Sequence, residues 1–179
     1  MEDFLRLTSK YPPLVIDIES TGGEIWDEMI ELAIVDTNCN VLFNNRFKPQ
    51  VVFFDHISYA THGMTPKQLT KEQSFKKYEQ QISRILSNRI ILSYNAKSDM
   101  AFLYRTYRRY NRILPLFAMA CIETMHQKAT KLKQPVSLAK ACRDFEIMPE
   151  TGYHTALGGA RCAAKLFNKL RTYNLGTKR

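Results

Sequence analysis

Three short apolar segments in the first third of the chain predict β-strands. They cover residues 14–18 (LVIDI), 28–35 (EMIELAIV) and 41–48 (VLFNNRFK). The first segment is dense in β-branched residues, which is typical of a strand buried on both faces. Asp and Asn residues at 36–40 suit a tight turn between the second and third segments. Because the connections are short, the three segments predict an antiparallel meander.

Apolar residues at helical spacing dominate the rest of the chain. They predict helices over residues 75–87, 96–110, 138–145 and about 156–171. A fourth strand is predicted at residues 89–94. This order of elements indicates an α/β fold in which helices flank a mixed central sheet of three antiparallel strands and further parallel ones. No linker divides the chain, so we expect a single domain over 1–179. Its core would span about 12–171, followed by a short flexible C-terminal tail.

The charge balance favours an anionic partner. The chain carries 26 lysines and arginines against 17 acidic residues, a formal net charge of +9. Nucleic acid is the expected partner, because phosphate contacts by basic side chains release counterions. The alternative is a basic surface that serves only solubility.

The remaining composition argues against membrane and secreted classes. No apolar run is long enough to cross a membrane, and the first residues hold two acids and no apolar segment of signal-peptide length. Four scattered cysteines without a C-x-x-C pair indicate buried thiols in a reducing compartment rather than disulfides or a zinc site. We therefore expect a cytoplasmic protein and, since no dimerisation signal stands out, a monomer.

Two acids at the end of the first strand are the first candidates for chemistry. Asp17 and Glu19 are two residues apart, so both side chains leave the same face of the strand. Two close carboxylates repel each other unless a cation lies between them, and Mg²⁺ and Mn²⁺ prefer such oxygen ligands. The alternative is that these acids are simply solvated at a strand end.

Asp99 and His154 are the next candidates. Asp99 lies in the first turn of a predicted helix that directly follows an apolar strand, where it could serve only as a favourable helix-end charge. It could equally lie beside Asp17, because ligands gather at the carboxyl ends of strands. His154 precedes the last helix and could take a proton from water, or could be an ordinary surface histidine.

Four segments, in register, resemble the DnaQ-like DEDDh 3′→5′ exonucleases of the ribonuclease H-like superfamily. Residues 15–22 (VIDIESTG) are similar to the first motif, I-D-x-E-T-T-G, and residues 94–103 (YNAKSDMAFL) to the second, H-N-A-x-F-D-x-x-F-L. Residues 154–157 (HTAL) open the third motif, H-x-A-L-x-D-A, and residues 62–65 (HGMT) resemble the H-G-I-T segment. The resemblance covers about 14–170.

This resemblance implies a ribonuclease H-like fold and metal-dependent hydrolysis of phosphodiester bonds at a 3′ end. Asp17 would touch both of two Mg²⁺ or Mn²⁺ ions, Glu19 one of them and Asp99 the other, while His154 would act as general base. Thr21 and Asn95 would position the metal ligands or the terminal nucleotide, and Ile18 and Phe102 would pack near the terminal base and sugar.

The chain departs from the third motif at its acid. Five residues after His154, where the family carries an aspartate, the sequence has Gly159, and no acidic residue follows. Losing a metal ligand would weaken the site strongly, so the chain could be an inactivated form. Alternatively, water or a substrate oxygen could fill the vacant coordination position. Retention of His154 favours an exonuclease.

The resemblance leaves three classes of function open. The leading prediction is a metal-dependent exonuclease on single-stranded DNA or DNA 3′ ends, with RNA as a close variant. The second is a catalytically inactive nucleic-acid-binding module. The third is a proofreading-type accessory subunit that binds a DNA polymerase.

Overall fold

The computed structural model describes residues 11–51, 56–149 and 154–176. Its centre is a five-stranded sheet with the strand order β3-β2-β1-β4-β5. The strands are β1 Leu14–Ser20, β2 Met29–Asp36, β3 Val41–Arg46, β4 Ile90–Ser93 and β5 Ala118–Cys121. β1, β2 and β3 pair antiparallel, whereas β4 and β5 run parallel to β1. The predicted meander and mixed sheet are therefore confirmed.

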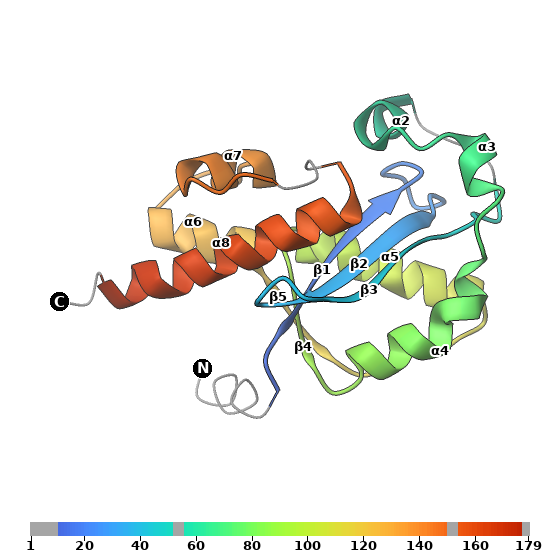
Figure 1. Ribbon diagram of the computed structural model, residues 1–179, viewed down its shortest axis with the longest axis horizontal. Coiled ribbons are helices and arrows are strands. Elements are labelled where there is room, and N and C mark those ends of the chain that lie inside the picture. Colours follow the sequence, from blue (N-terminus) through green and yellow to red (C-terminus); the bar gives the residue numbers. More distant parts are fainter. Residues whose placement is uncertain (1–10, 52–55, 150–153, 177–179) are drawn as a thin grey trace.

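Helices cover both faces of this sheet (Figure 1). They are α2 His56–His62, α3 Pro66–Leu69, α4 Phe75–Leu86, α5 Ala96–Arg109, α6 Ile122–Thr130, α7 Leu138–Asp144 and α8 Ala156–Gly176. The long α8 lies along β1 and β2 and also packs against α6 and α7. Within the described residues, no helix is both long and apolar enough to cross a membrane.

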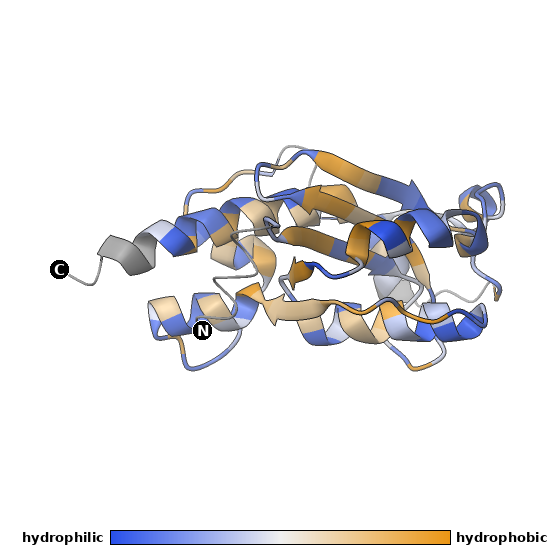
Figure 2. Cartoon of the chain, turned by 90° about the horizontal axis from the view of Figure 1, so that it is seen from below, coloured by the Kyte–Doolittle hydropathy of each residue, from blue (hydrophilic) through white to orange (hydrophobic). Residues whose placement is uncertain are grey.

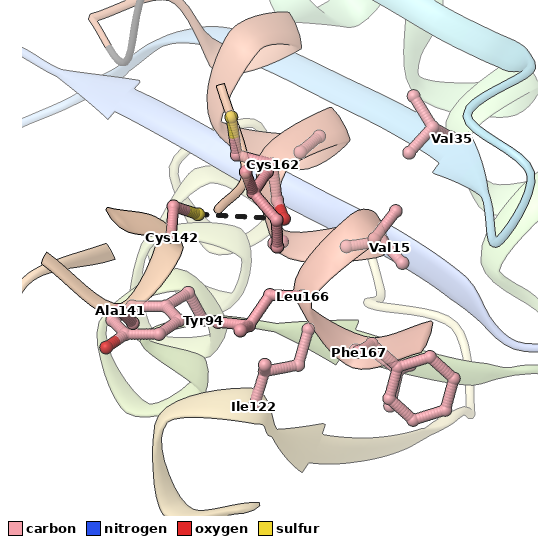
Figure 3. Close-up of a cluster of buried hydrophobic side chains, with 14 of the residues drawn as sticks. Val15, Val35, Tyr94, Ile122, Ala141, Cys142, Cys162, Leu166 and Phe167 are labelled. Atoms are coloured by element: carbon pink, nitrogen blue, oxygen red, sulfur yellow. Dashed lines mark hydrogen bonds between the residues drawn. The ribbon is translucent and has the colours of Figure 1, made fainter. Parts of the chain in front are cut away.

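Alternating residues of the strands form two separate apolar cores. Val15 of β1 belongs to a cluster on the α8 side of the sheet, which Figure 3 shows in close-up with Cys142 and Phe167. Leu14 and Ile16 belong to a second cluster, which includes buried residues of α4 and α5. Figure 2 shows the same division as apolar strands between helices with polar outer faces. The alternation on β1 decides which face receives each of its acids.

The predicted elements are present, with some corrections. Ser137 caps α7 by accepting a hydrogen bond from the Lys140 amide, as expected. α8 continues to Gly176, so the expected tail from residue 174 onward is helical as far as that residue, and residues 177–179 lie outside the described part. Of the four cysteines expected to be buried, Cys142 and Cys162 are buried, whereas Cys39 and Cys121 are partly exposed.

Candidate active site

β1 brings Asp17 and Glu19 to the face of the sheet that α8 covers. Both follow Val15 at intervals of two residues, and Val15 packs in the α8-side core. In the antiparallel pairing of β1 with β2, Glu19 lies opposite Glu31. Directly paired residues of neighbouring strands point to the same face, so three carboxylates gather over the end of β1.

α5 contributes Asp99 from its first turn. The helix begins directly after β4, and the side chain of Asn95 caps it by accepting a hydrogen bond from the Ser98 amide. Asp99 is buried, with 6% of its surface exposed, and the Ser93 hydroxyl donates a hydrogen bond to its Oδ2 atom. The positive end of the helix dipole favours a negative charge at this position.

These carboxylates destabilise one another's charged forms. Burial and then the charges of Asp99, Glu19 and Glu31 raise the pKa of Asp17 well above its usual value. Burial, Glu31 and Asp99 raise the pKa of Glu19 to about 7, and burial raises the pKa of Asp99 to about 7 despite the Ser93 hydrogen bond. The structure thus brings the three predicted acids together. Acids that are simply solvated at a strand end would not need to lie so close to one another.

The start of α8 lies against the same carboxylates. Thr155 caps the helix, since its hydroxyl accepts a hydrogen bond from the Gly158 amide at 3.1 Å. A Cβ atom added at Gly159 would lie 2.6 Å from Cγ of Asp17 and would collide with its carboxylate. His154, two residues before the helix, has an exposed side chain. Position 159 therefore belongs to the site, and the Asp17 carboxylate fills the space beside it.

Glu31 is a fourth carboxylate that the sequence reasoning missed. It is buried, with 5% of its surface exposed, and its Oε2 atom accepts a hydrogen bond from the Ala156 amide at 3.0 Å. Its Oε1 atom lies 3.5 Å from Nε of Arg46. Glu31 therefore fixes the first turn of α8, the helix that carries Gly159, relative to β2. The available signal was an acid in the middle of the apolar segment 28–35.

The donor set fits a hard divalent cation. In the described part of the chain, no lysine or arginine forms an ion pair with Asp17, Glu19 or Asp99. Carboxylate oxygens left without a cation are the ligands that Mg²⁺ and Mn²⁺ take. As the side chains stand, no three or more His, Cys, Asp or Glu among the described residues could together hold a metal ion. Binding a cation between them would therefore require these side chains to move.

The four residues predicted to contact ligands or nucleotide occupy different surroundings. Ile18 packs against the core on the α4 and α5 side, opposite the face of Asp17. Thr21 is buried, and its hydroxyl donates to Asp27 Oδ1 at 2.7 Å. Asn95 is exposed where it caps α5. Phe102 is buried beneath the guanidinium of Arg105, 4.3 Å from the ring centroid. Their roles toward a substrate stay predictions.

The fourth similar segment, residues 62–65, lies beside the end of β1. His62 lies close to the backbone of Ser20, and its Nδ1 atom accepts a hydrogen bond from the Met64 amide at 3.0 Å. Gly63 has a φ of 66°, a conformation that glycine adopts readily. Thr65 forms a capping box with Gln68 at the start of α3. The segment thereby shapes the rim of the site.

Comparisons with known proteins agree with this arrangement. The RNase_T family model, described as exonuclease, matches residues 14–167. RNA exonuclease 4 of Candida glabrata is 25% identical over 169 residues, covering 90% of this chain and 60% of that protein. This chain therefore spans less than two thirds of that relative.

Solved structures share the fold. The nuclease domain of 3′hExo, a DEDDh family member bound to rAMP, superposes with a TM-score of 0.69 at 16% identity and covers 92% of both chains. Exonuclease X in complex with 5′-overhanging duplex DNA superposes with a TM-score of 0.69 at 15% identity, covering 89% of this chain and 91% of that one. At these identities the likeness concerns the fold alone.

Proposed function

Because this chain belongs to the DEDDh exonuclease family of the ribonuclease H-like fold, we propose that it removes nucleotides from the 3′ ends of single-stranded RNA. The observation that carries the proposal is the cluster of Asp17, Glu19 and Asp99, which two elements distant in sequence bring to one place. RNA is favoured over DNA by the relative named RNA exonuclease 4. The DNA substrate predicted from the sequence is the alternative that the experiment below separates.

Enzymes of this family use divalent metal ions, which supply charge stabilisation for the attacking and leaving oxygens of the phosphodiester. In this chain Asp17, Glu19 and Asp99 would hold two such ions. β1 and the first turn of α5 hold the backbone of these three residues in place, so that only their side chains would have to move to bind the ions. Glu31 holds the start of α8, and the exposed imidazole of His154, just before that helix, would accept a proton from the attacking water.

The test is digestion of single-stranded RNA and DNA of one sequence, each labelled at its 5′ end, with Mg²⁺ or Mn²⁺. We expect a ladder that shortens from the 3′ end and advances faster on RNA. Asp17→Asn should lower the rate more than about 100-fold, because even losses around metal ligands cost 10- to 100-fold. An unchanged circular dichroism spectrum would show that the variant folds. Equal rates for Asp17→Asn and the parent chain would exclude this active site.

Gly159 supports a second candidate function, a nucleic-acid-binding protein without catalysis. The position next to Asp17 offers no side chain to a cation. Such a protein would bind the same oligonucleotides in EDTA and never shorten them with any divalent ion. The digestion assay decides between the two candidates, because only the exonuclease produces a ladder.

A further inference from the structure

The loop between β1 and β2 exposes two large apolar side chains. Ile25 is 73% exposed and Trp26 is 64% exposed. Trp26 is also the only tryptophan of the chain. Single exposed apolar residues are common, but two large neighbours on one loop leave much apolar surface in water. The loop follows directly from the strand that carries Asp17.

Hydrogen bonds hold this loop in a defined shape. The carboxylate of Asp27 accepts from the Thr21 hydroxyl and from the Glu24 amide, both at 2.7 Å. The Thr21 hydroxyl in turn accepts from the Glu28 amide at 3.0 Å. Gly22 is required here, since a Cβ atom at that position would collide with Asp27. Trp26 is therefore presented on a rigid backbone, which lowers the entropy lost when a ligand packs on it.

Two arginines of α5 tie the same loop to the helix. Arg105 donates to the Glu24 carbonyl oxygen and Arg109 to the Trp26 carbonyl oxygen, each at 2.9 Å. Each guanidinium has five N–H donors, so these bonds leave others free to meet phosphate oxygens. Arg109 is partly neutralised by Glu28 at 3.0 Å, whereas Arg105 forms no ion pair in the described part of the chain. The loop thus combines an exposed indole with guanidinium groups that anchor its backbone, and an aromatic surface with nearby positive charge suits an unpaired nucleotide.

The loop is displaced from the reacting end along α5. Asp99 lies in the first turn of that helix, whereas Arg109, which holds Trp26, is its last residue. Ten helical residues correspond to about 15 Å. The residue that anchors the Trp26 loop is therefore well separated from Asp99 along α5.

Resting on the function proposed above, we propose that Trp26 is a stacking platform for an unpaired base upstream of the 3′-terminal nucleotide, and that Arg105 contacts its phosphate. Base stacking on an aromatic face tolerates any sequence, so the platform would raise affinity for single strands without selecting a base. Its contribution would depend on substrate length, because a dinucleotide would not reach it.

The only tryptophan makes a direct binding experiment possible. A single-stranded 12-nucleotide RNA is titrated into the full chain in EDTA, and the fluorescence of Trp26 is recorded. N-acetyl-tryptophanamide is titrated alongside to correct for absorption by the RNA. We expect saturable quenching. Anisotropy of the labelled RNA should show that Trp26→Ala weakens binding about 5-fold or more and that Trp26→Phe restores most of it. Leu116→Ala is the matched control, since it removes an 83% exposed side chain next to β5 that no step invokes.

Length dependence separates the platform from a general structural effect. With Mg²⁺ or Mn²⁺, Trp26→Ala should raise KM for the 12-nucleotide RNA, leave kcat unchanged and leave the kinetics on a dinucleotide unchanged. Binding without any change in Trp26 fluorescence, and equal affinity of Trp26→Ala, would overturn the platform while the exonuclease proposal stands. That outcome would also be expected if the loop docks a protein. Absence of both cleavage and RNA binding would overturn the proposed function itself.

Discussion

Gly159 has no side chain, and the Asp17 carboxylate occupies the space that a side chain there would need. Glycine in the first turn of a helix costs about 1 kcal/mol relative to alanine, so helix stability does not explain it. The glycine leaves room for Asp17 in its present orientation. Restoring an acid at position 159 therefore changes two things at once, the number of carboxylates and the position of Asp17.

A pair of variants separates these two effects. Gly159→Ala displaces the Asp17 carboxylate without adding a charge, whereas Gly159→Asp displaces it and adds one. If the site lacks a metal ligand, Gly159→Asp should exceed Gly159→Ala in kcat/KM by about 10-fold or more at limiting Mg²⁺. It should also melt at a lower temperature in EDTA, because it adds repulsion. Equal kcat/KM values for the two variants would contradict a missing ligand.

The position of Glu31 next to Glu19 is a feature of the site that the sequence alone does not predict. The placement of Asp17, Glu19 and Asp99 at strand ends and their resemblance to family motifs both predict these acids, and the structure brings them together. Glu31 belongs to no such motif, and its nearness follows from the register that places it opposite Glu19. Register depends on pairing between strands and on turn geometry, which a pattern of apolar residues leaves open.

At the scale of elements, segments with a clear apolar pattern were predictable, including the short β4 and α7, and segments without one were not. Helices α4, α5 and α8 and strands β1 to β4 follow the apolar pattern. β5 (AMAC) has four residues and lacks β-branched side chains, so nothing local distinguishes it from a helix. It is fixed instead by parallel pairing with β4. Helices α2, α3 and α6 were also missed, and α3, with four residues, is too short to show a helical period.

His126 of α6 is buried, and its burial makes the stability of the fold depend on pH. His126 has no exposed surface and packs edge-on against Phe145, with ring centroids 5.7 Å apart. Burial lowers the pKa of His126, and Lys140 lowers it further, while Asp144 opposes both. Below the unfolded-state pKa of about 6.5, the unfolded chain binds a proton that the folded chain resists. Stability contributed by neutral His126 is therefore present above that pH and lost as the pH falls.

A plot of melting temperature against pH should have a different slope for His126→Phe than for the parent chain. From pH 7.5 to 5.5 the melting temperature of the parent should fall relative to that of the variant, because phenylalanine has no proton to gain. Comparing slopes removes any constant change in packing that the larger ring causes, and also the titration of other groups. Thermal melts followed by circular dichroism across this range provide the measurement. Parallel curves would contradict a neutral buried His126.

On the scale of the whole molecule, the candidate site joins three parts of the fold that are distant in sequence. β1 carries Asp17 and Glu19, α5 carries Asp99, and α8 lies against Asp17 through Gly159. Burial and then mutual repulsion raise the pKa values of the acids, so both effects oppose their charged forms in this assembly near neutral pH. A cation between them would reverse the sign of that interaction. Metal binding should consequently stabilise the entire domain.

Mn²⁺ should therefore raise the melting temperature of the full chain above its value in EDTA. At 100 times the dissociation constant, binding to the folded state alone stabilises by about 2.7 kcal/mol, or about 5–10 °C for a chain of this size. Asp99→Asn provides the matched variant, because it removes one charge and keeps the volume. It should melt higher than the parent in EDTA and gain little from Mn²⁺. A parent chain that is insensitive to Mn²⁺, or an Asp99→Asn variant with the full shift, would show that these carboxylates do not hold the ion.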